Sequence, residues 1–284
     1  MKILVTGGAG FIGSNLIRTL LEEDHQVISI DNYSTGVKEN HLKGCKYWEY
    51  DLAEELSPPL VEKYDVIYHI AALARIQPSL RNPAYHIKNN YLSTLNVLKC
   101  AKENQSRIIY AGSSSYYGGV YKSPYAFSKF QGEQLCKLYS DLYNMNIGIA
   151  RFYNVYGPNQ IEWGLYATAV GIWEKQYRNN QPLTITGDGT QRRDFTHVYD
   201  IVAALKLMLD GNYKADIFEL GSGKNFSMNE VVAMFGKHYP KKYLPSRQGE
   251  YDKTLCDYTF ARMELGWEPQ HNLEDYINGN LRIL

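Results

Sequence analysis

The chain has 284 residues, and its 30 basic and 30 acidic side chains give a formal net charge of zero. A chain of this length buries a sizeable core without disulfides, and its balanced charge excludes a broad basic surface for nucleic acid or an anionic membrane. The four cysteines are far apart, with no C-x-x-C pair and no histidine set at metal spacing, so we expect free thiols and no metal site. The first apolar run is too short for a signal peptide, and no run of about 18 uncharged apolar residues follows, so we expect a cytoplasmic protein.

The first half of the chain alternates short β-rich apolar runs with longer amphipathic segments. The expected strands are Ile3–Thr6, Val27–Ile30, Val66–Ala71, Arg107–Ala111 and Ile147–Arg151. The expected helices, in which apolar positions recur at three and four residues, are Phe11–Glu22, Ala84–Glu103 and Tyr125–Tyr143. This alternation predicts βαβ units and a parallel sheet with helices on both faces.

The pattern changes after Gly157-Pro158, where Tyr, Trp, Pro and Gly are scattered among shorter elements. We therefore expect an α/β protein with a doubly wound parallel sheet over residues 1–155 and a smaller, mainly substrate-binding lobe over residues 156–284. The chain is expected to return to the first part around residues 194–220. Because no repeat, charge block or low-complexity linker divides the chain, the two parts should share a broad interface.

A glycine-rich turn directly follows the first expected strand and opens the first expected helix. Gly8, Gly10 and Gly13 satisfy G-x-G-x-x-G, and this context strengthens a motif that is weak by itself. Glycine is needed because a tight turn and close backbone approach leave no room for a Cβ, while the helix N-terminus offers free N–H groups to a pyrophosphate. The motif predicts a Rossmann-type dinucleotide-binding domain.

Asp31 ends the second expected strand about 20 residues further on, where a carboxylate binds ribose hydroxyls. The presence of Asp31 at this position argues against the alternative that the glycine-rich turn binds no ligand. Because a carboxylate also repels a 2′-phosphate, NAD is favoured over NADP, although Lys38 or Arg18 would complicate this preference. Besides Asp31, the residues that these motifs assign to the cofactor are Gly7, Gly10, Phe11, Ile12, Gly13, Asn32, Ser34, Asp51 and Leu52.

Tyr125 and Lys129 are four residues apart and therefore share one face of an expected helix. By itself this spacing describes an ordinary surface pair. However, Ser113 ends a strand just upstream and can bring a hydroxyl to the same cleft. An ammonium and a positive nicotinamide ring both favour a phenolate, which would make Tyr125 a general base. We expect these three residues to be catalytic, with Ser114 and Ser115 as the alternatives to Ser113.

Together the motifs resemble those of the extended short-chain dehydrogenase/reductase family, and within it the nucleotide-sugar epimerases of the UDP-glucose and UDP-N-acetylglucosamine 4-epimerase type. The resemblance covers nearly the whole chain, and the joint occurrence of its motifs in this order is specific. It rests on Thr6–Ser14, Asp31–Asn32, His69–Ala72, Asn89–Asn90, Ser113–Gly118, Tyr125 with Lys129, Arg151–Pro158, Arg193–Phe195 and Arg247–Glu250.

This resemblance implies NAD-dependent C4 epimerisation of a UDP-hexose through a transient 4-keto intermediate, in a homodimer paired through helices 84–103 and 125–143. It implies that Tyr125 and Lys129 also contact the cofactor, together with Ala71, Ala72 and Asn89. Arginine suits a diphosphate because its planar fork makes bidentate bonds, although a single arginine is more often part of a surface ion pair. The implied substrate-binding residues are Ser114, Asn154, Arg193, Arg247, Glu250 and Thr254.

Other reactions of the same family remain alternatives: uronate 4-epimerisation, 4,6-dehydration and 4-keto-sugar reduction. Ser114 and Ser115 stand where the 4,6-dehydratases carry an acidic residue or pair, so elimination is disfavoured. A non-catalytic NAD-binding scaffold is the alternative from a different class, since a fold can keep a cofactor cleft without its chemistry. The presence of both Tyr125 and Lys129 argues against a scaffold.

Two features depart from the family pattern. Only 12 residues separate Ser113 from Tyr125 (125 minus 113), fewer than in typical relatives, and this predicts a more open active-site rim. Thr254 stands where some relatives carry a tyrosine that narrows the pocket. The smaller side chain predicts that N-acetylated UDP-hexoses are accepted, unless Tyr251 or Tyr166 fills the same space.

Overall fold

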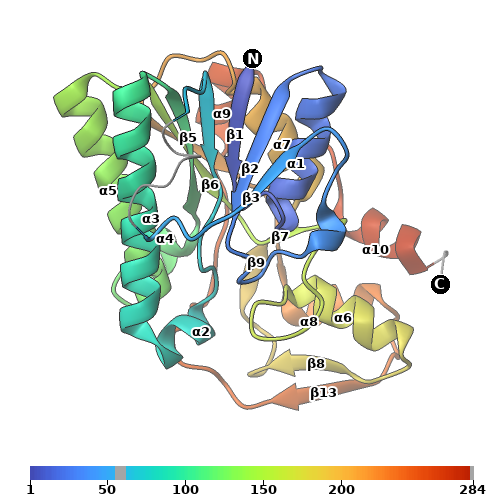
Figure 1. The fold of residues 1–284 in the computed structure, drawn as a ribbon. Coiled ribbons are helices and arrows are strands. Elements are labelled where there is room, and N and C mark those ends of the chain that lie inside the picture. Colours follow the sequence, from blue (N-terminus) through green and yellow to red (C-terminus); the bar gives the residue numbers. More distant parts are fainter. Residues whose placement is uncertain (55–61, 282–284) are drawn as a thin grey trace.

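A computed structural model describes residues 1–54 and 62–281 and contains a seven-stranded parallel sheet (Figure 1). The strands are β1 (Lys2–Thr6), β2 (Gln26–Asp31), β3 (Lys46–Glu49), β4 (Val66–His69), β5 (Arg107–Ser113), β6 (Ile147–Phe152) and β11 (Lys214–Leu220). Their order is β11-β6-β5-β4-β1-β2-β3. The order reverses at β1, and ligands bind at the carboxyl ends of the strands beside such a reversal.

Helices cover both faces of this sheet. Helices α1 (Phe11–Glu22) and α7 (Val198–Leu207) lie on one face, and α3 (Pro83–Asn104) and α5 (Pro124–Tyr143) lie on the other (Figure 1). The side chains of β1 alternate accordingly, because Ile3 and Val5 belong to the core beneath α1 while Leu4 belongs to the core beneath α3. This alternation explains why the strands are apolar throughout, as expected of a parallel sheet buried on both faces.

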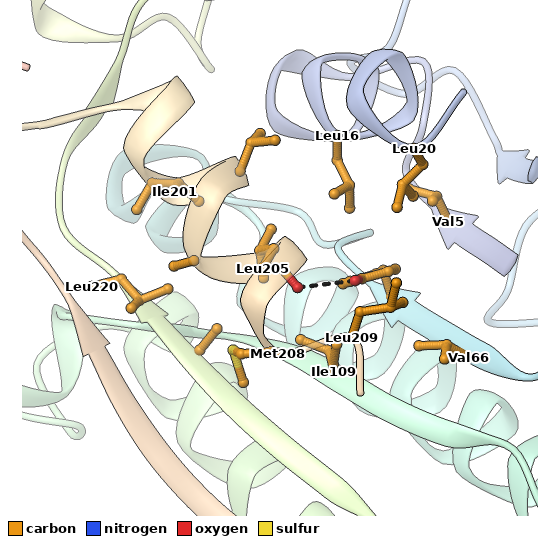
Figure 2. Close-up of a cluster of buried hydrophobic side chains, with 14 of the residues drawn as sticks. Val5, Leu16, Leu20, Val66, Ile109, Ile201, Leu205, Met208, Leu209 and Leu220 are labelled. Carbon is orange, nitrogen blue, oxygen red and sulfur yellow. Dashed lines mark hydrogen bonds between the residues drawn. The ribbon is translucent and has the colours of Figure 1, made fainter. Parts of the chain in front are cut away.

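The core between α1, α7 and the sheet is closely packed. Leu16 and Leu20 of α1 face Leu205 of α7 above the strands (Figure 2). The buried hydroxyl of Tyr68 in this cluster is satisfied, since it donates to the carbonyl oxygen of Leu205 at 2.9 Å. The cluster fixes the first helix against the sheet, and with it the glycine turn that precedes this helix.

Smaller elements gather at the carboxyl edge of the sheet, in the lower part of Figure 1. Three strand pairs are formed there by β7 (Val155–Tyr156) with β10 (Thr196–His197), β9 (Arg192–Asp194) with β12 (Asn225–Ser227), and β8 (Leu183–Thr186) with β13 (Lys241–Leu244). The shorter helices of the chain are η1 (Lys38–Asn40), α2 (Ile76–Arg81), α4 (Ser115–Gly118), α6 (Ala169–Arg178), α8 (Met228–Met234), α9 (Thr259–Leu265) and α10 (Leu273–Leu281). A third core cluster, around Tyr156, Trp173 and Phe195, holds α6, α8 and α10 together.

The predicted fold class is confirmed. Helix α1 has the predicted bounds, and α3 and α5 begin one residue earlier than predicted. The strand predicted to reach Ala71 ends at His69. The chain leaves the sheet there because the backbone N–H of Ala71 donates to Thr6 Oγ1 at 3.1 Å and so turns toward the first strand. Within the described ranges, no helix combines the length and apolarity needed to cross a bilayer.

Replacing Leu16 by alanine should lower the free energy of unfolding by about 2–5 kcal/mol, because the side chain is 0% exposed and leaves a cavity. Leu207→Ala on α7 is the matched control, since Leu207 is 47% exposed and its truncation should cost less than about 1 kcal/mol. Urea denaturation measures both. Equal losses in the two variants would contradict the assignment of the core.

Candidate active site

A cavity of about 480 Å³ lies at the carboxyl edge of the sheet and is also lined by the smaller elements. It collects nearly all of the site residues expected from the sequence. Those that line it are Gly7, Gly10, Phe11, Ile12, Gly13, Asp31, Asn32, Ser34, Asp51, Leu52, Ala71, Ala72, Asn89, Ser113, Ser114, Tyr125, Lys129, Asn154, Arg193, Arg247 and Glu250. One continuous space therefore contains the glycine turn, the expected catalytic groups and the arginines.

The glycine turn leaves no room for side chains. Gly7 has φ +73°, and a Cβ placed on it would lie 2.9 Å from the backbone of Ala71. A Cβ on Gly13 would lie 2.2 Å from the carbonyl oxygen of Gly7. Helix α1 begins after Gly10, which provides no side-chain cap, so its first N–H groups are available to an anion in the cavity. These features fit the pyrophosphate of a dinucleotide.

The carboxylate of Asp31 is fixed at the end of β2. It accepts hydrogen bonds from the backbone N–H groups of Ala9 at 3.0 Å and Tyr33 at 2.9 Å. Burial raises the pKa of Asp31, and these two hydrogen bonds oppose the rise. Each carboxylate oxygen keeps a lone pair for a further donor. This acceptor, held beside the glycine turn, fits the ribose hydroxyls of NAD.

Asp51 is hydrogen-bonded to two asparagines that also line the cavity. Its carboxylate accepts hydrogen bonds from the side-chain amides of Asn32 at 3.2 Å and Asn89 at 3.4 Å. The two amides come from the loop after β2 and from α3, so Asp51 joins elements on different sides of the cavity. These hydrogen bonds therefore connect three of the residues expected to contact the cofactor.

The first turn of α5 brings Tyr125 to the end of β5. Ser123 caps this helix by accepting the N–H of Ala126, and the backbone N–H of Tyr125 donates to Ser79 Oγ at 3.1 Å. The phenol of Tyr125 donates to Ser113 Oγ at 3.3 Å. Of the three serines considered, Ser113 is therefore the one in hydrogen-bond contact with the tyrosine.

Lys129 lies one turn further along α5 and is buried in the same cavity. Its ammonium lies 4.3 Å from the ring centre of Tyr110, and burial lowers the pKa of Lys129 to about 8. Burial raises the pKa of Tyr125, while the hydrogen bond to Ser113 and the positive charge of Arg75 oppose that rise. Arg75 lines the same cavity and was not among the site residues expected from the sequence. The available signal was a basic residue in an otherwise apolar segment, Ile70–Ile76, after a buried strand.

A buried ion network lies behind the serine segment. Arg151 of β6 bonds Glu133 of α5 at 2.6 Å and Glu219 of β11 at 2.9 Å. Tyr117 donates its hydroxyl to Glu219 at 2.6 Å, and the guanidinium carbon of Arg151 lies 4.0 Å from the ring centre of Tyr116. The network therefore connects α5, the sheet and the segment that follows Ser113.

Charged groups from the C-terminal half reach the opposite wall of the cavity. Arg193 is buried, pairs with Glu250 at 3.1 Å, and lies 4.2 Å from the ring centre of Tyr251. Arg247 is exposed and also lines the cavity. These residues place two guanidinium groups where an anionic substrate can enter.

The two remaining predicted residues both contact Asp194. Asn154 lines the cavity and donates from its amide to the carbonyl oxygen of Asp194 at 2.8 Å. Thr254 is 2% exposed, does not belong to the cavity lining, and accepts the N–H of Asp194 at 3.4 Å. Thr254 is therefore not among the residues that line the cavity, and the acceptance of N-acetylated sugars stays a prediction. Tyr166 and Tyr251 line the cavity instead.

Comparison with known proteins identifies the family. Residues 3–221 match the NAD dependent epimerase/dehydratase family. A putative UDP-glucose 4-epimerase of Methanocaldococcus jannaschii is 34% identical, covering 97% of this chain and 95% of the relative. The chain belongs to the NAD-dependent epimerase/dehydratase family, and its Rossmann fold and NAD cofactor are those of an extended short-chain dehydrogenase/reductase enzyme.

Solved structures agree with this assignment. The UDP-glucose 4-epimerase of Thermotoga maritima, determined with UDP-glucose, has a TM-score of 0.91 and 30% identity, covering 99% of this chain and 98% of its own. The UDP-glucuronic acid 4-epimerase of Bacillus cereus, in complex with UDP-glucuronic acid and NAD, has a TM-score of 0.89 and 29% identity, again covering 99% and 98%. Nucleotide-sugar enzymes with different sugar substrates therefore share this fold.

Gly13→Ala should abolish NAD retention, because the new Cβ would lie 2.2 Å from the Gly7 carbonyl oxygen and force the turn apart. The matched control is Gly279→Ala in α10, where a Cβ meets nothing within 4 Å. NAD released from the denatured protein measures the effect. Normal NAD content in the Gly13 variant would contradict the proposed pyrophosphate site.

Arg151→Met should lower the free energy of unfolding by about 3–5 kcal/mol, because it leaves the buried carboxylate of Glu133 and the mostly buried carboxylate of Glu219 without their cation. The control is Arg178→Met, which removes a partly exposed pair with Glu162 and should cost less than about 1 kcal/mol. Denaturant unfolding of both variants gives the comparison. A loss at Arg151 no greater than that at Arg178 would show that the network is not structurally important.

Proposed function

We propose that this protein is an NAD-dependent C4 epimerase of UDP-hexoses, acting on UDP-glucose and UDP-galactose, on their N-acetylated counterparts, or on both. The observation that carries the proposal is the 3.3 Å contact between the Tyr125 phenol and Ser113 Oγ, inside the cavity that also contains the glycine turn. A phenol in contact with a hydroxyl can exchange a proton with a sugar hydroxyl, while the cofactor exchanges a hydride with the carbon that carries it.

In the proposed cycle, Tyr125 accepts the proton of the C4 hydroxyl and Ser113 hydrogen-bonds the same oxygen. The glycine turn and Asp31 would hold NAD, and Lys129 would hold its nicotinamide ribose; the cofactor would supply hydride transfer at C4, outward and then back to the opposite face. Tyr125 then returns its proton to the 4-keto oxygen. Because the hydride also returns to C4, no net oxidation results. Inversion requires that the sugar turns over between the two transfers.

Turning of the sugar requires that the nucleotide stays bound. We assign the diphosphate to Arg193, Arg247 and Asn154, and the uridine ribose to Glu250. The burial of Arg193 and its pairing with Glu250 support a rigid nucleotide site. The sugar would then be held more weakly than the nucleotide, as the reaction demands.

Uronate 4-epimerisation is the second candidate, and the similarity to the Bacillus cereus enzyme favours it. The 4,6-dehydratase and 4-keto-sugar reductase reactions share the first hydride step. Dehydration is disfavoured because Ser114 and Ser115 supply no carboxylate beside Ser113. A non-catalytic scaffold is disfavoured by the contact between Tyr125 and Ser113.

We further propose that residues 1–155, with the return at 194–220, form the NAD-binding part, and that residues 156–284 mainly bind substrate. The pairing of β11 with β6 supports that return.

A homodimer through α3 and α5 is supported by Leu138 and Leu142 of α5, which are exposed. The four free cysteines support a reducing, cytoplasmic location.

Incubation of the purified protein with UDP-glucose, UDP-N-acetylglucosamine and UDP-glucuronate, each without added cofactor, tests the proposal by NMR. C4 inversion of a UDP-hexose is expected. Tyr125→Phe should lower kcat by about 10²–10⁴-fold and leave the Kd for the UDP-sugar unchanged. Turnover of UDP-glucuronate alone would favour the second candidate, whereas normal binding without any turnover by the wild type would favour the scaffold.

A further inference from the structure

His69 is a buried histidine at the end of β4 that the proposed cycle does not use. The residue is 1% exposed, and both of its ring nitrogens contact buried hydroxyl groups. Nδ1 lies 2.8 Å from Thr6 Oγ1 at the end of β1, and Nε2 lies 3.2 Å from Thr94 Oγ1 in α3. Buried polar groups that have all of their hydrogen-bond partners restrict the elements that carry them. The ring of His69 therefore connects the ends of two adjacent strands to α3.

The hydrogen-bond partners determine which ring nitrogen carries the proton. The hydroxyl of Thr94 donates to the carbonyl oxygen of Asn90 at 2.8 Å, so its oxygen accepts the Nε2–H of His69. Burial, together with the charge of Lys129, lowers the pKa of His69 to about 3, so the ring carries one N–H. Nδ1 therefore accepts a hydrogen bond from the hydroxyl of Thr6. Each hydrogen bond of the ring has one direction.

On the Thr6 side, the hydrogen bonds continue to the glycine turn. The backbone N–H of Ala71 donates to Thr6 Oγ1 at 3.1 Å. The backbone of Ala71 lies against the turn, since a Cβ on Gly7 would be 2.9 Å from the Cα of Ala71. Ala71 and Gly7 both line the cavity. Thr6 therefore fixes the chain after β4 against the turn that would hold the pyrophosphate of NAD.

On the Thr94 side, the hydrogen bonds continue to the helix of the reactive phenol. The side-chain amide of Asn90, one turn before Thr94, donates to Ser128 Oγ at 2.9 Å. Ser128 Oγ in turn donates to the carbonyl oxygen of Tyr125 at 2.9 Å. The same amide accepts the backbone N–H of Leu73 at 2.8 Å and donates to its carbonyl oxygen at 3.2 Å. Asn90 therefore joins α3 and the chain after β4 to the first turn of α5.

We propose that His69 is a positioning residue of the active site, which as the Nε2–H tautomer fixes the glycine turn through Thr6 and the first turn of α5 through Thr94. The inference rests on the proposed function, in which NAD and Tyr125 act at the same sugar carbon. One of the two would be held on each side of the ring, so the loss of either contact should change their relative position. His69 does not line the cavity, and its ring exchanges no proton with the substrate.

The first test is 15N NMR of protein labelled in its histidines, recorded without substrate. His69→Gln assigns the resonance because it lacks it, and Thr94→Val provides a second assignment because it changes the surroundings of Nε2. The expected pattern is a proton on Nε2 and none on Nδ1, unchanged from about pH 6 to about pH 8, where an ordinary histidine titrates. A proton on Nδ1, or a resonance that titrates in this range, would overturn the proposal.

The second test compares the two sides of the ring. Thr6→Val leaves the N–H of Ala71 without its acceptor, so NAD loss during dialysis should become about tenfold faster, the effect of one hydrogen bond. Thr94→Val removes the acceptor of the Nε2–H and should lower kcat for UDP-hexose epimerisation about tenfold, with NAD content and KM unchanged. Thr6→Ser and Thr94→Ser keep the hydroxyl and should restore each property.

The serine variants and the Tm of all four proteins separate positioning from stability. If both valine variants lost NAD and kcat to the same extent, and serine did not restore either, the network would have a structural role alone and the proposal would be wrong. The NMR pattern and the rate of NAD loss need no turnover. They therefore test His69 even if no UDP-hexose is converted, an outcome that would contradict the proposed function instead.

Discussion

Arg151 forms the buried ion network on which the geometry of the active site depends. Its guanidinium joins Glu133 of α5 and Glu219 of β11 from its own place in β6. Charges removed from water require well-placed partners, so these bonds restrict how α5 lies against the sheet. The contact between Ser113 and Tyr125 spans the same boundary, from β5 to α5. The ion network thus helps to keep the side-chain oxygens of Tyr125 and Ser113 in contact with each other.

The parallel sheet determines where the remaining site residues gather. All seven strands point their carboxyl ends to the same edge, so the glycine turn, the carboxylate of Asp31 and the hydroxyl of Ser113 come from different strands to one cavity. The elements of the C-terminal half close this edge and contribute Arg193 and Arg247. The strand ends therefore contribute the glycine turn, the carboxylate of Asp31 and the hydroxyl of Ser113 to the cavity lining, and the smaller elements contribute guanidinium groups.

The sequence was sufficient to predict the fold class, the main helices and most of the residues that line the cavity, because these depend on local periodicity and on spacing within short motifs. It did not reveal the partners of Arg151 or the position of Arg75, since these contacts form only when distant segments meet. The sequence also did not show that Thr254 lies outside the cavity lining. In an irregular segment, spacing along the chain does not determine which side chain turns inward, and Tyr251 lines the cavity there.

The backbone of Arg75 carries a torsional cost that glycine would not have, since its φ is 116°. Selection for heat resistance alone would therefore enrich glycine at this position. The same exchange would remove a guanidinium that lines the cavity and is fixed on the carbonyl oxygen of Tyr166. Directed evolution scored on thermal survival would thus change the charge of the cavity without any selection for activity.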